Sequence, residues 1–119
     1  MKKFKAFIAL DCKTNEANIK VVKKLSSQVF GFKVGYRSFY NEGSEKLLAE
    51  IKKNKCILFL DLKLHDIPNT VSTAISSLSK INPDYLTLHI SGGKTMLAQS
   101  LIAIKKYKLK TKLLGVTKL

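Results

Sequence analysis

Charged residues interrupt an apolar segment near the middle of the chain. Residues 56–60 form a continuous apolar run, which is typical of a strand buried on both faces. Asp61 and Lys63 follow at alternate positions, so a regular strand would place both side chains on one face. Because a buried charge costs several kcal/mol, the pair indicates either a structural ion pair or a catalytic site. Asp66 comes next, outside the strand, as a further charge of the site or as a helix cap.

Lys33 is a second charge placed inside an apolar segment, residues 30–35. A lysine buried in a sheet needs a carboxylate partner, and the next strand along the chain can supply Asp61. Strand adjacency therefore predicts the spatial order Lys33, Asp61, Lys63, with Asp66 available as a fourth member. The alternative is a purely structural layer of charges inside a barrel.

Five apolar segments alternate with amphipathic ones at a spacing of about 27 residues. We expect strands at residues 4–10, 30–35, 57–63, 85–90 and 113–117. A turn at 82–84 is expected before the fourth strand.

Each predicted helix has a start signal and one apolar face. Thr14 or Asn15 caps the first, Ser44 caps the second, Pro68 opens the third, and residues 91–94 lead into the fourth. Their apolar positions are, in turn, Ile19, Val22 and Leu25; Leu47, Leu48 and Ile51; Val71, Ala74, Ile75 and Leu78; and Leu97, Leu101 and Ile104.

Alternating strands and helices predict an α/β fold with a parallel sheet. Five parallel strands could form an open sheet with helices on both faces, or part of a closed barrel. A complete (β/α)8 barrel takes about 250 residues, whereas this chain has 119.

Residues 61–70, with the sequence Asp-Leu-Lys-Leu-His-Asp-Ile-Pro-Asn-Thr, resemble the motif of orotidine 5′-phosphate decarboxylases. The wider suprafamily, with hexulose-phosphate synthase and ketogulonate-phosphate decarboxylase, shares only Asp-x-Lys-x-x-Asp. Residues 65–70 therefore favour the orotidylate branch. The resemblance runs from residues 9–11 to residues 116–117.

The resemblance implies that residues 1–119 are a single partial domain, the first five βα units of a (β/α)8 TIM barrel. We expect a fragment or a truncated gene with little activity alone, because the family's phosphate-binding loops would lie beyond Leu119. Two alternatives stay open: a sugar-phosphate enzyme of the same suprafamily, or a non-catalytic half-barrel that pairs with another chain.

The resemblance also implies a reaction, the conversion of orotidine 5′-phosphate to UMP in de novo pyrimidine biosynthesis, without metal or organic cofactor. Lys63 would protonate C6 of the ring, and Asp61 would lie next to the substrate carboxylate. Lys33 would hold Asp61 and touch the ribose, and Asp11 would bind a ribose hydroxyl. The resemblance further implies a homodimer in which three residues reach into the partner's site: Asp66, Ile67 and Thr70.

The formal net charge of +14 raises the question of nucleic-acid binding. Arg37 is the only arginine, and arginine is the usual reader of phosphates and bases. The lysines cluster where helices are expected to end, where cations complement the helix dipole. We therefore expect no nucleic-acid partner and a small-molecule substrate.

The remaining signals carry less information. No apolar run approaches the roughly 20 residues of a membrane helix, and the apolar part of the N-terminal segment, residues 6–10, is too short for a signal peptide. We expect a cytoplasmic protein without a membrane partner. Cys56 is predicted to be a core residue, and nothing marks Cys12 as a nucleophile. His89 could line the site or be a satisfied strand-end histidine, and residues 91–94 weakly suggest a phosphate loop.

Overall fold

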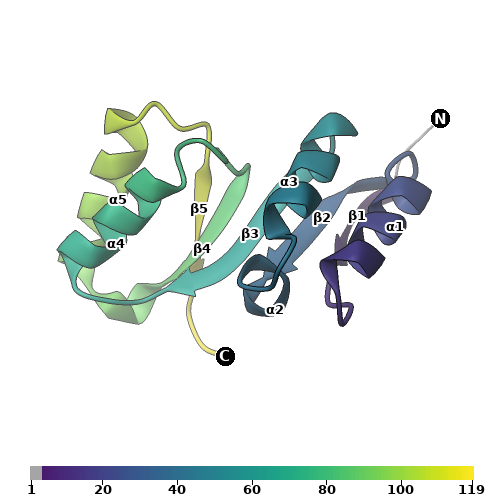
Figure 1. The fold of residues 1–119 in the computed structure, drawn as a ribbon. Coiled ribbons are helices and arrows are strands. Elements are labelled where there is room, and N and C mark those ends of the chain that lie inside the picture. Colours follow the sequence, from purple (N-terminus) through teal and green to yellow (C-terminus); the bar gives the residue numbers. More distant parts are fainter. Residues whose placement is uncertain (1–3) are drawn as a thin grey trace. The chain divides into compact units, whose positions relative to one another are not determined.

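The computed structural model describes residues 4–119 as alternating strands and helices (Figure 1). The strands are β1 (Phe4–Ala9), β2 (Val29–Gly35), β3 (Ile57–Leu64), β4 (Tyr85–His89) and β5 (Lys112–Val116). The helices are α1 (Asn15–Leu25), α2 (Tyr36–Phe39), α3 (Ser44–Lys53), α4 (Pro68–Ser77) and α5 (Lys94–Lys106), with a 3-10 turn η1 (Ile90–Gly92) before α5. Within this part of the chain, no helix is both long and apolar enough to cross a membrane.

The strands form one sheet whose order follows the sequence, β1-β2-β3-β4-β5. The pairs β1–β2, β2–β3 and β4–β5 are parallel. Each return to the sheet passes through helical residues, as parallel pairing requires. The predicted α/β alternation with a parallel sheet is therefore confirmed.

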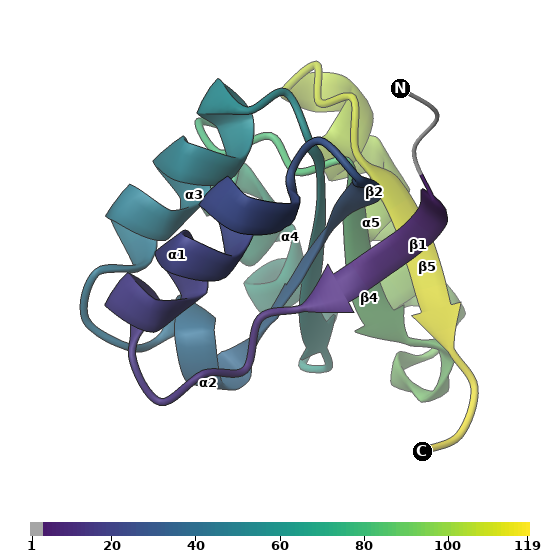
Figure 2. The same cartoon turned by 90° about the vertical axis from the view of Figure 1, so that its right-hand side faces the viewer.

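The chain divides into two compact units, with the boundary inside β3 between Asp61 and Leu62. In the first unit α1 and α3 lie side by side (Figure 2). Its core contains fully buried apolar side chains from these helices and from β2: Val22, Phe32, Val34, Leu47 and Ile51. A Cβ atom at Gly31 would overlap the backbone carbonyl oxygen of Ile57, so close contact between β2 and β3 requires glycine there.

The second unit pairs α4 with α5 over β4 and β5. Its core contains Val71 and Ile75 from α4, Leu86 and Leu88 from β4, and Met96 from α5. The predicted apolar face of α4 is confirmed at Val71 and Ile75, and at Leu78 directly after the helix.

The buried face of α5 differs from the prediction. Leu101 is 56% exposed, and the buried residues are Met96, Ser100 and Ala103. The prediction took the largest apolar side chains as the core face. In the structure the buried face begins one residue earlier, at Met96, and Ser100 is tolerated there because its hydroxyl donates to the Met96 carbonyl (2.7 Å).

Helix starts were partly predicted. Thr14 caps α1, and its hydroxyl accepts a hydrogen bond from the Ala17 amide (3.1 Å), as expected. Ser44 is wrong as a cap, because Gly43 holds that position with φ of +84°, where glycine is favoured. The α4 cap is Ile67, so Asp66 is not the cap residue either. The short helix α2 was not predicted.

Within each unit, polar contacts join successive strand–helix repeats near the amino ends of the strands. In the first unit the Ser26 hydroxyl lies 3.2 Å from Asn54 Oδ1, at a sequence separation of 28. In the second unit the turn before β4 lies at residues 78–81, earlier than the predicted 82–84, and Asn82 follows it with φ of +46°.

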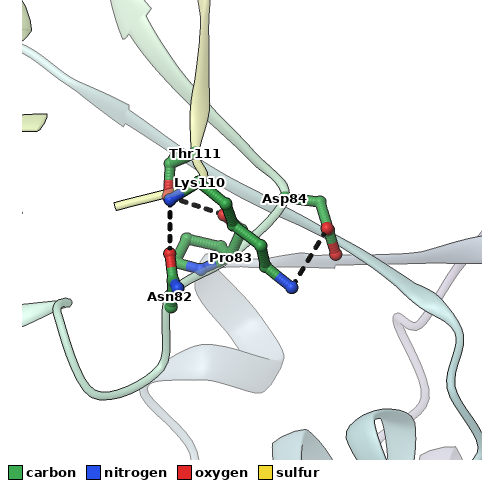
Figure 3. Close-up of polar contacts among 5 residues, drawn as sticks. All are labelled: Asn82, Pro83, Asp84, Lys110 and Thr111. Carbon is green, nitrogen blue, oxygen red and sulfur yellow. Dashed lines mark hydrogen bonds and ion pairs between the residues drawn. The ribbon is translucent and has the colours of Figure 1, made fainter. Parts of the chain in front are cut away.

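The turn at Asn82 binds the segment that enters β5 (Figure 3). Its Oδ1 atom accepts the Lys110 amide (3.0 Å), and the Thr111 hydroxyl donates to the Pro83 carbonyl (2.6 Å). Lys110 Nζ lies 3.2 Å from Asp84 Oδ1. We call these five residues the Asn82 turn cluster.

Candidate active site

Lys33 and Asp61 form an ion pair in the first unit. Phe59 is the register partner of Lys33 on β3, so Asp61 lies two residues further along on the same face. Lys33 Nζ is 3.4 Å from Asp61 Oδ2, and the two side chains are 37% and 10% exposed. The predicted pairing of Lys33 with Asp61 is confirmed.

Lys63 departs from regular strand geometry. Its φ is +47°, in the left-handed region that non-glycine residues rarely adopt. The prediction that Asp61 and Lys63 share a face rested on a regular strand, and the backbone is not regular at Lys63. Its amide donates to the Thr87 hydroxyl oxygen on β4 (2.9 Å). Strained backbone of this kind is frequent at functional sites.

Asp66, Ile67 and Thr70 lie at the start of α4 and are exposed. The Asp66 carboxylate accepts a hydrogen bond from the Ile67 amide (2.7 Å), which fixes the turn before the helix. Ile67 is 65% exposed, an unusual position for a large apolar side chain. The three residues therefore present carboxylate, apolar and hydroxyl groups at one surface of the second unit.

A surface hollow of about 540 Å³ lies beside this segment. It is lined by His65, Asp66, Ile67, Pro68, Ser91 and Gly92. The rings of His65 and His89 are 5.0 Å apart, which places His89 against the same segment. The prediction had not assigned His65 to the site, although it lies within the motif between Lys63 and Asp66.

The glycines of residues 91–94 have a packing role. A Cβ atom at Gly92 would overlap the Met96 side chain, and Gly93 has φ of +98°. These constraints account for both glycines without a phosphate. The phosphate-loop interpretation therefore stays a prediction.

Asp11 follows β1 and is exposed, with its carbonyl 3.3 Å from an Arg37 guanidinium nitrogen. Its two chain neighbours are both held by buried polar side chains. Asn18 Oδ1 accepts the Cys12 amide (3.0 Å), and the Ser38 hydroxyl donates to the Leu10 carbonyl. The backbone on either side of Asp11 is thus fixed.

Asn15, Asn18 and Ser38 form a buried polar network that joins α1 to α2 and to the segment that follows α2. The Asn18 amide nitrogen donates to Asn15 Oδ1 (3.0 Å) and to Ser38 Oγ (2.9 Å). The Asn15 amide nitrogen donates to the carbonyls of Ser38 and Glu42, both at 2.9 Å. The sequence held a signal for this network, since Asn15 and Asn18 share the helical spacing of buried Val22.

The two cysteines differ in burial. Cys56 is buried, as predicted, and its thiol donates to the Ser26 carbonyl oxygen (3.5 Å), whereas Cys12 is half-buried. Among residues 4–119 no group of three histidine, cysteine, aspartate or glutamate side chains is placed to hold a metal ion.

Parallel strands with charged side chains near their carboxyl ends define a class of α/β protein that includes the (β/α)8 barrel enzymes. A crystal structure of orotidine 5′-phosphate decarboxylase from Pyrococcus horikoshii OT3 has the same fold, with a TM-score of 0.76 at 24% identity over 94% of this chain and 50% of that one. The predicted fold class is confirmed, and the chain corresponds to about half of such a barrel.

The family model for "Orotidine 5'-phosphate decarboxylase / HUMPS family" matches residues 5–119, and the chain belongs to that family. Orotidine 5′-phosphate decarboxylase of Staphylococcus aureus (strain Newman) is 40% identical over 112 residues, covering 94% of this chain and 48% of that protein. An uncharacterized conserved protein from Geobacillus kaustophilus matches with a TM-score of 0.85 at 29% identity, over 95% of this chain and 54% of that one. The chain spans about half the length of the curated relatives it matches.

Proposed function

We propose that this chain supplies the catalytic strands of an orotidine 5′-phosphate decarboxylase. The observation that carries the proposal is the Lys33–Asp61 ion pair, which joins a lysine of β2 to the first residue of the motif, on β3. Identity of 40% to a protein named orotidine 5′-phosphate decarboxylase supports decarboxylation in pyrimidine biosynthesis as the family activity.

In the proposed reaction the bond between C6 of the orotate ring and its carboxylate breaks. The electron pair stays on C6, CO2 leaves, and Lys63 donates a proton to C6 to give UMP. The ammonium charge of Lys63 stabilises the developing negative charge before the proton moves. The neutral lysine then regains its proton from solvent. No metal or organic cofactor takes part in this proposal.

Asp61 and Lys33 serve the same step in different ways. Asp61 faces the substrate carboxylate and disfavours the bound ground state, as some accounts of such enzymes hold. Lys33 neutralises Asp61 and contacts the ribose. Asp11 binds a ribose hydroxyl from its fixed position after β1.

A homodimer completes the proposed site. Asp66, Ile67 and Thr70 are exposed at the start of α4, which supports a role in reaching the substrate bound by the partner subunit. We place the protein in the cytoplasm, with orotidine 5′-phosphate as its small-molecule substrate and without nucleic-acid or membrane partners.

Residues 1–119 alone should turn over substrate slowly or not at all. The chain matches about half the length of its relatives, and we propose that the phosphate-binding residues lie in the other half of those proteins. Binding energy from the phosphate holds the reacting ring in the site, so its loss lowers kcat as well as affinity.

The test compares residues 1–119 with the longest polypeptide that the gene encodes. Each is assayed for conversion of orotidine 5′-phosphate to UMP by chromatography, with Lys63→Ala as the control. Turnover that depends on Lys63 in the longer polypeptide supports the proposal. Turnover by residues 1–119 alone at a rate near that of a full-length relative would show that the chain is self-sufficient and would contradict the partial-site proposal.

Two other functions have specific support. The family description includes the HUMPS enzymes, so a sugar phosphate is the second substrate class. Binding of UMP but not of a hexulose phosphate in a calorimetric titration would favour orotidine 5′-phosphate over a sugar phosphate as the substrate. The half-length match supports a non-catalytic half-barrel that pairs with another chain. A defined hetero-complex on gel filtration, without nucleotide bound, would favour that function.

A further inference from the structure

We infer that Thr87 is a positioning residue for Lys63, and that it acts by fixing the backbone from which the lysine side chain extends. The inference deepens the proposed function, since it assigns a task to a residue that supports the proposed proton donor. Thr87 lies outside the Asp-x-Lys-x-x-Asp motif, on β4.

The contact between the two residues is direct. The Lys63 amide donates to Thr87 Oγ1 at 2.9 Å, and Lys63 has φ of +47°. Thr87 is 6% exposed and lies between Leu86 and Leu88, which are 1% and 2% exposed. Its own low exposure shows that the threonine side chain is buried, and a β-branched side chain has few alternative rotamers.

The hydrogen bond matters because of the backbone that it holds. In a regular parallel ladder a strand amide donates to a carbonyl of the neighbouring strand. The Lys63 amide donates to a side chain, at the residue where the backbone turns left-handed. A conformation that L-residues disfavour persists when its surroundings over-determine it, and an acceptor for the half-buried amide is one such constraint.

The position of the amine follows from this backbone. The direction of the Cα–Cβ bond sets where the lysine side chain starts, and Nζ lies five bonds from Cα. A small rotation at Cα therefore displaces Nζ by an ångström or more, a distance that can cost about 100-fold in rate at a reacting centre. Thr87 thus acts on the reaction through Lys63.

Thr111 provides a matched control in the same unit. It is also 6% exposed, and its hydroxyl donates to the Pro83 carbonyl in the Asn82 turn cluster (Figure 3). A change to valine removes the hydroxyl that makes the Lys63 contact at Thr87 and the hydroxyl that makes the Pro83 contact at Thr111. Only Thr87 contacts a residue of the proposed site.

The first experiment measures amide hydrogen exchange at Lys63 by NMR, which requires no activity. In Thr87→Val we expect exchange at Lys63 to rise by about tenfold or more, because its acceptor is lost. In Thr87→Ser, which keeps the hydroxyl, and in Thr111→Val, exchange should stay within about twofold. An unchanged rate at Lys63 in Thr87→Val would overturn the inference. If Thr87→Val does not fold, Thr87→Cys replaces it, since its sulfur is a weak acceptor of similar size.

The second experiment measures kcat and KM for the whole polypeptide that the gene encodes. We expect Thr87→Val to lower kcat by about 10- to 100-fold with KM within about threefold. Thr87→Ser should restore most of kcat, and Thr111→Val should leave both constants unchanged despite a similar loss of stability. Equal losses of kcat in both valine variants would show that Thr87 has only a structural role and would contradict the inference.

The two experiments separate the inference from the proposed function. A wild-type polypeptide that does not decarboxylate orotidine 5′-phosphate contradicts the proposed function, whereas the exchange rate at Lys63 still decides whether Thr87 holds this backbone. Normal turnover with unchanged kcat in Thr87→Val contradicts the inference and leaves the proposed function standing.

Discussion

Lys33 Nζ on β2 lies 3.4 Å from Asp61 Oδ2 on β3, so the carboxylate is largely buried but faces a lysine of the neighbouring strand. The lysine side chain is 37% exposed, so solvent reaches the ion pair from the side of Lys33. The lysine thus supplies a counter-charge to a mostly buried carboxylate while its own side chain stays partly accessible to solvent.

Changing Asp61 to Asn should lower the free energy of unfolding by about 1–2 kcal/mol, because Lys33 loses its carboxylate partner while part of its charge stays hydrated. Urea unfolding followed by circular dichroism measures the change. The control is Asp84→Asn, whose partner Lys110 is 58% exposed, so the expected loss is about 0–1 kcal/mol. Equal losses at the two sites would contradict a special role for burial.

Changing Lys63 to Gly should give a more stable protein than changing it to Ala, by about 1–2 kcal/mol, because glycine adopts positive φ without penalty. At Lys112, in the regular strand β5, the order should reverse, with Ala favoured by about 0.5–1 kcal/mol. Thermal unfolding of the four variants gives both differences. The same order at both positions would show that Lys63 is not left-handed in solution.

Changing Asn18 to Ala should cost about 1–3 kcal/mol of stability, since the Cys12 amide and the Ser38 hydroxyl each lose a buried partner. Asn41→Ala is the control. Its side chain donates to the Lys13 carbonyl at an exposed site, so the expected change is within about 0.5 kcal/mol. The Asn18 variant should also bind UMP more weakly than the Asn41 variant in a calorimetric titration. Similar stability and similar UMP affinity in the two variants would contradict the idea that the buried network positions Asp11.

Changing Gly31 to Ala should destabilise the first unit by more than about 2 kcal/mol, because the new methyl group overlaps the Ile57 carbonyl and the backbone must shift. Gly35→Ala is the matched control on the same strand. A Cβ atom there would lie 3.8 Å from the Asp61 carbonyl oxygen, an ordinary contact, so the expected change is below about 1 kcal/mol. Chemical unfolding of both variants tests the difference, and a smaller loss for Gly31→Ala would contradict the close β2–β3 approach.

The sequence predicted those features that depend on periodicity. The strands, the parallel order and the Lys33–Asp61 pair all follow from a repeat of apolar and amphipathic segments. Thr14 was predictable as a cap because its side chain acts locally, on Ala17.

Features that depend on the details of tertiary packing were missed or wrong. Leu101 is exposed because the packing of α5, and not its largest side chains, chooses the buried face. The left-handed backbone at Lys63 is held by Thr87, which is 24 positions away. No local pattern around Lys63 indicates such a partner. The roles of Asp11, Lys63, Asp66, Ile67 and Thr70 in binding and catalysis stay predictions.

The polar contacts at the strand ends have a consequence for how the chain could fold during synthesis. Ser26 to Asn54, Leu10 to Ser38 and Asn82 to Lys110 each span 28 positions, the length of one strand–helix repeat. Each of these contacts can therefore form as soon as one further repeat has left the ribosome, without waiting for distant sequence. Contacts of such uniform and limited range favour stepwise folding from the amino end.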